Sequence, residues 1–168
     1  MTVAIIGGTG CQKIIKDGAI RREINTPYGT AVLFEKTLGD DLLYLMLRHG
    51  EGHRVPPHLV NYRANIAALS LMGVTQAIGI YAVGSITDMV SPGDLGVINQ
   101  FIDFTGGSRE STFHTGEETP VRHIPMERPF DEHLQEMILR EANRLGIPLA
   151  SGGTYVCTNG PRLETVAA

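Results

Sequence analysis

The sequence has few of the features that mark secreted, membrane-spanning or nucleic-acid-binding proteins. Its 168 residues include no tryptophan and only two cysteines, Cys11 and Cys157, which form neither a CxxC pair nor a metal-ligand spacing. We therefore expect reduced thiols and a cytoplasmic location. No apolar run approaches the roughly 20 residues that a membrane-spanning helix requires, and the N-terminus lacks the basic flank of a signal peptide. A net charge of -4 without a basic tract argues against a nucleic-acid partner.

What the sequence does contain predicts a compact α/β protein. Hydrophobic residues make up 42% and charged residues 19%, with 20 glycines, which is typical of a globular, loop-rich chain. The length predicts one domain over residues 1–168. Apolar patterning predicts strands or buried apolar segments over residues 3–6, 31–36, 42–47, 77–83, 95–102 and 153–157. Helices are predicted over 58–72, ended by Gly73, and from an N-cap at Asp131 to a stop at Gly146. This alternation favours a layered α/β fold.

Positive side chains gather in one segment of this mildly acidic chain, Arg48–His58. It contains His49, His53 and His58, half of the six histidines, and two arginines. The segment follows the apolar residues 42–47, so its donors would lie at the end of a strand, where open α/β sheets bind ligands. Arg and His are suited to anions. We interpret the segment as an oxyanion site, for phosphate, with Arg48 and His49 as donors.

The three histidines of this segment could also be plain surface residues, which would need no ligand at all. A metal site is less well supported, because a metal would need carboxylate ligands and only Glu51 is near. Gly50 and Gly52 also oppose the helix that would bring two histidines to one face. We expect His58 to be a residue at a helix start rather than a ligand.

Two further segments could bind a ligand. Gly7-Gly8-Thr9-Gly10 follows the first strand, and its backbone N–H groups with the Thr9 hydroxyl could hold an oxyanion, although a plain turn accounts for it equally well. A dinucleotide fingerprint would need glycine where Lys13 stands. In Gly160-Pro161-Arg162-Leu163-Glu164-Thr165, the carboxylate could accept hydrogen bonds from a heterocycle, or simply occupy a first helical turn.

Six ordered motifs together carry a family resemblance. They are Gly7-Gly8-Thr9-Gly10, Arg48-His49-Gly50, Asn61-Tyr62-Arg63-Ala64-Asn65, Ala82-Val83-Gly84-Ser85, His123-Ile124-Pro125-Met126 and Gly160-Pro161-Arg162-Leu163-Glu164-Thr165. In this order they resemble the trimeric purine nucleoside phosphorylases, and most of all the methylthioadenosine and methylthioinosine phosphorylase branch. The resemblance spans nearly the whole chain.

The resemblance implies a three-layer α/β/α fold with a central mixed sheet and a pentosyltransferase activity. Such enzymes cleave a purine nucleoside with phosphate to give the base and a ribose 1-phosphate, without a metal or organic cofactor. The phosphate-binding residues it implies are Thr9, Arg48, His49, Tyr81 and Ala82. The family usually has a small polar residue where Tyr81 stands, so the resemblance leaves open a side-chain contact from Tyr81.

The nucleoside site is implied in the same way. His123 would lie near the ribose and its 5′ substituent, contributed across the interface of a homotrimer, and Leu163 would pack on the purine. Glu164 would accept a hydrogen bond from the N1–H of a 6-oxopurine, whereas adenine offers only a lone pair at N1. This predicts inosine-type over adenosine-type substrates, with the choice between 5′-hydroxyl and 5′-methylthio left open.

The sequence stops at Ala168, where the related enzymes continue. Their further residues include the Asp or Asn that acts on purine N7, so we expect no leaving-group acid within residues 1–168 and little turnover from this chain alone. The main alternatives are a 5′-methylthioadenosine phosphorylase and a truncated, non-catalytic phosphate- or nucleoside-binding relative. A nucleoside hydrolase, which would not need phosphate, and a nicotinamide-dependent reductase are further alternatives.

Overall fold

The computed structural model describes residues 2–8, 10–11, 13, 18–106, 113–114 and 123–159. Within this part of the chain, contacts define two compact units, one extending to Val83 and the other beginning at Gly84. Phe113 belongs to the first unit, where its ring packs edge-on against Tyr28 with centroids 5.2 Å apart. The single-domain expectation for residues 1–168 stays a prediction.

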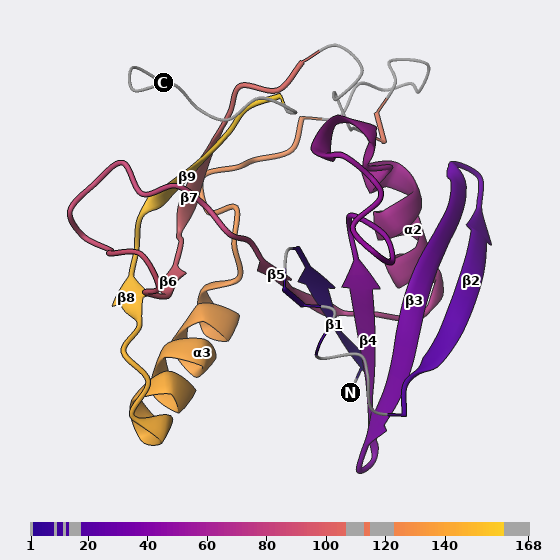
Figure 1. The fold of residues 1–168 in the computed structure, drawn as a ribbon, viewed down its shortest axis with the longest axis horizontal. Helices are drawn as coiled ribbons and strands as arrows, with labels where there is room; N and C mark the ends of the chain where they lie inside the picture. The colour runs from indigo at the N-terminus through magenta and orange to yellow at the C-terminus, as the bar shows by residue number, and fades with distance from the viewer. Residues whose placement is uncertain are drawn as a thin grey trace. The chain divides into compact units, whose positions relative to one another are not determined.

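The first unit is built on a five-stranded mixed sheet (Figure 1). Its strands are β1 (Thr2–Gly7), β2 (Ile20–Thr26), β3 (Gly29–Leu38), β4 (Asp41–Leu47) and β5 (Gln76–Ile80), in the spatial order β2-β3-β4-β1-β5. β1 runs parallel to both β4 and β5, whereas β3 is antiparallel to β2 and β4. The α/β class with a mixed central sheet is therefore confirmed. Gly7 pairs with Leu47 on one side and with Ile80 on the other, so three parallel strands end level.

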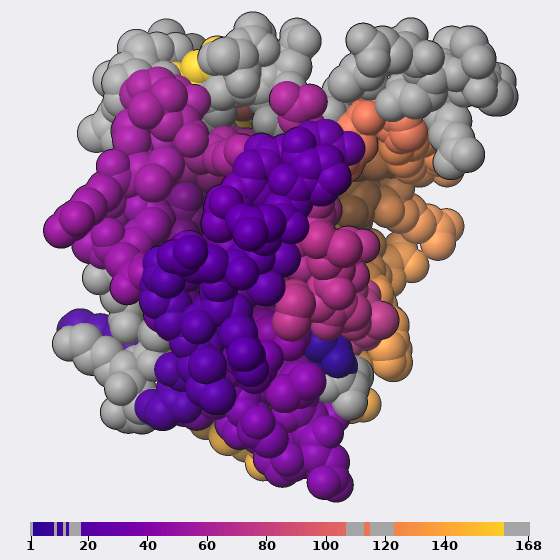
Figure 2. All heavy atoms as spheres, turned by 90° about the vertical axis from the view of Figure 1, so that its right-hand side faces the viewer, coloured from indigo at the N-terminus to yellow at the C-terminus, as the bar shows by residue number. Residues whose placement is uncertain are grey.

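The predicted strands over 31–36 and 42–47 are confirmed as β3 and β4, which form a hairpin closed at the Leu38–Asp41 pair. Gly39 in the turn has a φ of +61°, which glycine adopts without steric cost. β2 was not predicted, because most of its side chains are polar and exposed. Figure 2 shows the surface on this side of the unit. As an edge strand, β2 has few apolar contacts. Arg22 of β2 instead pairs with Glu35 of β3 at 2.8 Å.

Helix α2 (Tyr62–Leu71) begins four residues later than predicted. A short 3-10 helix, Pro57–Leu59, precedes it, and the Asn61 side chain accepts a hydrogen bond from the Ala64 N–H at 3.0 Å, which makes Asn61 the N-cap. Gly73, with a φ of +71°, follows the helix as predicted. The helix contacts β2 and β3. Leu59 and Leu71 are both more than 60% exposed.

The core of the first unit lies between α2 and one face of the sheet. Its buried residues are Ala4, Ala31, Leu33, Tyr44, Met46, Ala68 and Leu69. Leu33 and Met46 are the largest fully buried side chains, and each contributes about 1.5–3 kcal/mol of hydrophobic stabilisation. The small residues Ala64 and Ala68 are fully buried on α2, so the helix can approach the strands closely.

The second unit contains α3 (Glu132–Leu145) and two pairs of short parallel strands. β6 (Gly96–Val97) pairs with β8 (Ala150–Ser151), and β7 (Gln100–Asp103) pairs with β9 (Thr154–Cys157). The predicted ends of α3 are confirmed, because Asp131 accepts from the Leu134 N–H at 2.9 Å and Gly146 is left-handed. The predicted segment 95–102 is interrupted, since the Asn99 side chain accepts from the Gly153 N–H. Among the residues described, no helix combines the length and apolar character needed to cross a membrane.

Candidate functional site

The ends of three parallel strands form the candidate site. Because Gly7, Leu47 and Ile80 lie level, the next residues of the three strands, Gly8, Arg48 and Tyr81, follow at the same edge of the sheet. Backbone hydrogen bonds extend this register past the strands. The Gly8 N–H donates to the Ile80 carbonyl and the Arg48 N–H to the Gly7 carbonyl, both at 3.1 Å. These two hydrogen bonds fix the ends of β1, β4 and β5 to one another at the edge where Arg48 and His49 follow β4.

The Arg48 side chain extends from the end of β4 past Gly8 to the Tyr81 ring. Its guanidinium carbon is 4.4 Å from the centroid of the Tyr81 ring. A Cβ placed on Gly8 would lie 3.1 Å from Arg48 Nη2, so the absence of a side chain at Gly8 makes room for the guanidinium. Arg48 Nε is buried and has no hydrogen-bond partner in the described structure. Leaving such a donor unpaired costs about 1–3 kcal/mol, which an anion bound at this edge would remove.

His49 is held in one orientation beside Arg48. Only 6% of the residue is exposed, and Nδ1 lies 2.9 Å from the Val55 carbonyl oxygen. A carbonyl can only accept, so Nδ1 carries the proton and Nε2 of the neutral ring presents a lone pair. Burial lowers the pKa of His49 below its ordinary value, and the nearby charge of Arg48 acts in the same direction, against the opposing effect of the Val55 hydrogen bond. A neutral His49 can accept from a protonated phosphate oxygen, and it donates once protonated.

The loop after Arg48 is a tight structure that fixes His49. Gly50 and Gly52 have φ values of +70° and +72°, and His53, at +57°, is the one non-glycine residue with positive φ within the described ranges. The Val55 N–H donates a hydrogen bond to the His49 carbonyl oxygen at 2.8 Å. The His53 ring centroid lies 4.5 Å from that of His49. The loop glycines therefore serve the turn that holds His49.

The carboxylate that a metal at this cluster would need is engaged elsewhere. Glu51 accepts from Arg21 Nε at 2.8 Å, an exposed ion pair between the loop and β2. This pair also reduces the repulsion that Glu51 would exert on an anion beside Arg48. In the part of the chain that the structure describes, no group of three or more His, Cys, Asp or Glu side chains is arranged to hold a metal ion.

The other predicted site residues fall into three sets. Tyr81 and Ala82 follow β5 and are both exposed. His123 belongs to the second unit, where it is exposed. Thr9, Leu163 and Glu164 lie outside the described residues. The structure thus brings together Arg48, His49 and Tyr81.

His58 lies in the short helix Pro57–Leu59, close to the helix start that was expected for it. Its Nδ1 is buried without a hydrogen-bond partner among the described residues.

Three residues shape this edge in ways that the sequence did not predict. Gly8 leaves room for the Arg48 guanidinium, the Val55 carbonyl fixes the His49 ring, and Gly79 leaves room for the Tyr81 ring. Gly79 carried a signal, because glycine inside a strand often marks a close approach of another group. Val55 carried none, since any residue supplies a carbonyl.

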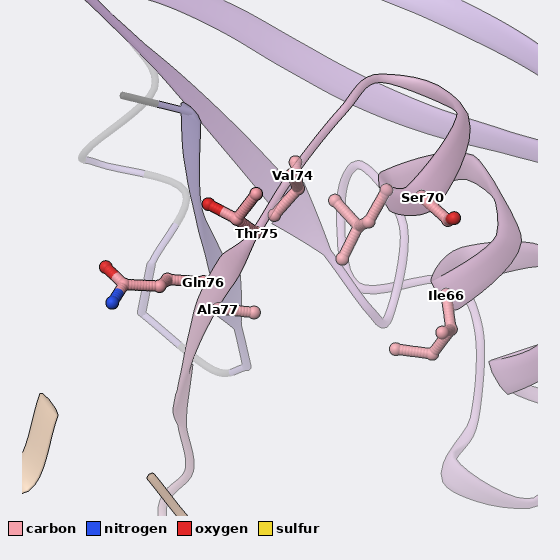
Figure 3. A pocket seen from close by; sticks show the side chains of 7 residues that line it. Ile66, Ser70, Val74, Thr75, Gln76 and Ala77 are labelled. Atoms are coloured by element: carbon pink, nitrogen blue, oxygen red, sulfur yellow. The ribbon is translucent and has the colours of Figure 1, made fainter. Parts of the chain in front are cut away.

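An apolar cavity of the first unit lies away from this edge. It has a volume of about 170 Å³ and lies at the start of β5, shown in Figure 3 between α2 and the segment that leads into the strand. Its lining residues are Ile66, Leu69, Ser70, Val74, Thr75, Gln76 and Ala77. None of these side chains carries a charge, so the cavity lacks the groups that an anion would require.

Known protein families and structures resemble this chain over nearly its whole length. The family model described as "Phosphorylase superfamily" matches residues 2–168. A 6-oxopurine nucleoside phosphorylase of Pyrococcus furiosus is 41% identical over 170 residues, which cover 98% of this chain and 64% of that protein. An S-methyl-5′-thioadenosine phosphorylase of Hyperthermus butylicus is 44% identical over 168 residues, covering 98% of this chain and 60% of the relative.

A solved structure of a phosphorylase has the same fold as this chain. Methylthioadenosine phosphorylase from Schistosoma mansoni in complex with tubercidin superimposes with a TM-score of 0.89 and 34% sequence identity. The match covers 98% of this chain and 65% of that one. The chain therefore spans a little under two thirds of the length of these three proteins.

Proposed function

This chain belongs to the phosphorylase superfamily, and on that premise we propose that its protein cleaves the N-glycosidic bond of purine nucleosides with phosphate. The products are the free base and a ribose 1-phosphate or 5-methylthioribose 1-phosphate. The membership confirms the resemblance inferred from the six sequence motifs. The observation that carries the proposal is the level ending of β1, β4 and β5, which gathers a buried, unpaired Arg48 Nε and the oriented His49 at one edge.

Phosphate is both nucleophile and stabilising charge in this reaction. As the bond to the base breaks, the ribose becomes oxocarbenium-like, and an anion fixed beside it lowers the energy of that state. Arg48 supplies charge and N–H donors to the phosphate, and His49 orients one of its oxygens. Thr9 and the Ala82 N–H complete the proposed phosphate site. No metal or organic cofactor is required, because the residues need only hold charge and position.

For the base, we propose a preference for 6-oxopurines. The support is Glu164, whose carboxylate accepts from a purine N1–H and is repelled by the N1 lone pair of adenine. A substrate that leaves the Glu164 carboxylate without a hydrogen bond should be strongly disfavoured against one that pairs with it. The name of the Pyrococcus furiosus relative, a 6-oxopurine nucleoside phosphorylase, agrees with this preference. The Hyperthermus butylicus relative supports the second candidate, a 5′-methylthioadenosine phosphorylase.

We also propose a homotrimer in which His123 lies near the ribose of a neighbouring subunit, with Leu163 packing on the purine. A role in purine salvage in the cytoplasm fits a reaction that frees a base, and it fits two cysteines that are both unpaired in the structure.

The test is base release by the product of the complete reading frame from inosine, 5′-methylthioinosine, adenosine and 5′-methylthioadenosine, with and without phosphate. We expect release that requires phosphate and favours the two 6-oxopurine substrates. Release without phosphate would indicate a hydrolase. No release from any substrate would favour a non-catalytic binding protein.

The substitution Glu164→Ser tests the specificity argument. We expect the ratio of kcat/KM for inosine to that for adenosine to fall at least about tenfold, since the carboxylate that discriminates at N1 is gone. An unchanged ratio would contradict the assigned role of Glu164.

A further inference from the structure

Tyr81 occupies a defined place at the end of β5. It is the first residue after the strand, and its ring folds back over Gly79. A Cβ added to Gly79 would collide with the Tyr81 hydroxyl oxygen and would lie within 2.7 Å of two ring carbons. The absence of a side chain at Gly79 therefore makes room for the ring in this position.

The Arg48 guanidinium lies over the Tyr81 ring. The distance from Arg48 Cζ to the ring centroid is 4.4 Å, well within the range of a cation–π contact. Arg is suited to stacking on aromatic rings, and a guanidinium stacked in this way keeps its in-plane N–H groups available to an oxyanion. Gly8 on the neighbouring strand leaves room for the guanidinium at Nη2. The two glycines thus allow Arg48 and the Tyr81 ring to come together in this place.

The stack also affects the strength of the contacts that Arg48 makes. A face covered by an aromatic ring is shielded from water, and charge-assisted hydrogen bonds are stronger where water is excluded. Arg48 Nε is already buried and unpaired. A small polar residue at position 81 would donate one hydrogen bond to phosphate and leave the guanidinium face open to water. Tyrosine gives up that single hydrogen bond and instead positions Arg48, which has several N–H donors for phosphate.

We propose that Tyr81 is a positioning residue for phosphate, acting through its ring on Arg48 rather than through its hydroxyl on the anion. This inference rests on the proposed function, because it assigns Tyr81 a part in the same phosphate site. It makes the aromatic ring, and not hydrogen bonding, the property that position 81 must supply in this protein.

Steady-state kinetics of Tyr81→Phe and Tyr81→Leu in the full protein test the proposal. Phenylalanine keeps the ring, so we expect the KM for phosphate to stay within about twofold of the wild type. Leucine removes the π face, and the KM for phosphate should rise about 3- to 30-fold while the KM for the nucleoside changes little. An unchanged phosphate KM in Tyr81→Leu, or an equal loss in Tyr81→Phe, would overturn the proposal.

A second series keeps the proposal testable if Tyr81→Leu does not fold. Fluorinated phenylalanines at position 81 preserve ring size and withdraw charge from the π face, so the phosphate KM should rise with each added fluorine. A KM independent of fluorination would contradict the stack. The matched control is Tyr28→Leu. The Tyr28 ring makes a similar contact elsewhere in the same unit, with Arg63 Cζ 5.5 Å from its centroid. The phosphate KM of this variant should equal that of the wild type.

Thermal unfolding with and without inorganic phosphate separates this inference from the proposed function. A ligand that binds only the folded state raises the Tm. No rise in the wild type would overturn the phosphate site itself, and the inference with it. A rise in the wild type that is equally large in Tyr81→Leu would leave the phosphate site intact and overturn only the role of Tyr81. We expect a rise in the wild type and in Tyr81→Phe, and a smaller one in Tyr81→Leu.

Discussion

The two edges of the sheet in the first unit differ in both shape and chemistry. At the amino edge of β5, α2 and the residues before the strand line an open cavity of about 170 Å³ that has no charged lining residue. At the carboxyl edge, Arg48 brings a buried, unpaired donor and His49 an oriented ring. The amino edge offers volume, and the carboxyl edge offers a buried donor, Arg48 Nε, that has no partner among the described residues.

This difference shows why concavity alone does not locate an anion site. Apolar volume stabilises a ligand through the area it buries, which is of little use to a small, strongly hydrated anion. Phosphate needs charge and N–H donors that have already lost their water and have no protein acceptor. The three parallel strand ends supply such donors, because their shared register fixes the chain segments that follow them.

Removing the charge at the carboxyl edge should have the largest effect. For Arg48→Met we expect kcat/KM to fall about 100- to 1000-fold, the range seen when a donor to developing charge is removed. Stability should be unchanged or higher, because the substitution also removes an unpaired buried donor. Kinetics and thermal unfolding measure the two effects. The control is Arg54→Met, an exposed arginine of the same loop, and a comparable activity loss in that variant would contradict a specific role for Arg48.

Acid should destabilise the fold through His49. Burial lowers the pKa of the folded ring below its ordinary 6.5, so the unfolded state binds the proton more readily. The stabilising contribution of neutral His49 is therefore fully present above pH 6.5 and is lost as the pH falls below it, towards the lower pKa of the folded ring. The slope from this one group cannot exceed about 1.4 kcal/mol per pH unit.

Urea unfolding of the wild type and His49→Gln between about pH 5 and 8 measures this contribution. The difference in unfolding free energy between the two should be constant above pH 6.5 and should shrink below it. His133→Gln, an exposed histidine of α3, is the control and should follow the wild type throughout. Parallel curves for the wild type and His49→Gln would show that His49 is not held neutral by the fold.

Filling the cavity at the amino edge should have the smallest effect on stability and on the KM for phosphate. Ala77→Val adds two methyl groups beside the apolar cavity, and stability should change by no more than about 0.5 kcal/mol. The KM for phosphate should stay within about twofold of the wild type. A large rise in that KM would mean that the two edges are coupled and do not act independently.

The sequence predicted the parts of this site that depend on local patterns. The apolar residues 42–47 predicted β4, and the change to Arg48-His49 marked its end. Asp131 and Gly146 predicted the limits of α3 because capping is a local interaction. The helix start at residue 58 was wrong, since Asn61 and not a residue near the prolines makes the capping bond to Ala64.

What the sequence could not predict depends on neighbours distant in the chain. β2 pairs mainly through its backbone at the sheet edge, and its polar side chains conceal that pairing. The contact between Arg48 and Tyr81 joins two different strand ends and depends on the register of β1 with both strands. The orientation of His49 depends on a backbone carbonyl. These three contacts leave no trace in the order of apolar and polar residues, which is what predicts a strand or a motif from the sequence.

Calorimetric titration of inorganic phosphate into the free protein tests the phosphate site without the need for nucleoside or turnover. We expect saturable binding to the wild type, retained in Ala77→Val and lost or weakened at least about tenfold in Arg48→Met. Phosphate binding that survives Arg48→Met unchanged would contradict the proposal that the level ends of β1, β4 and β5 form a phosphate site.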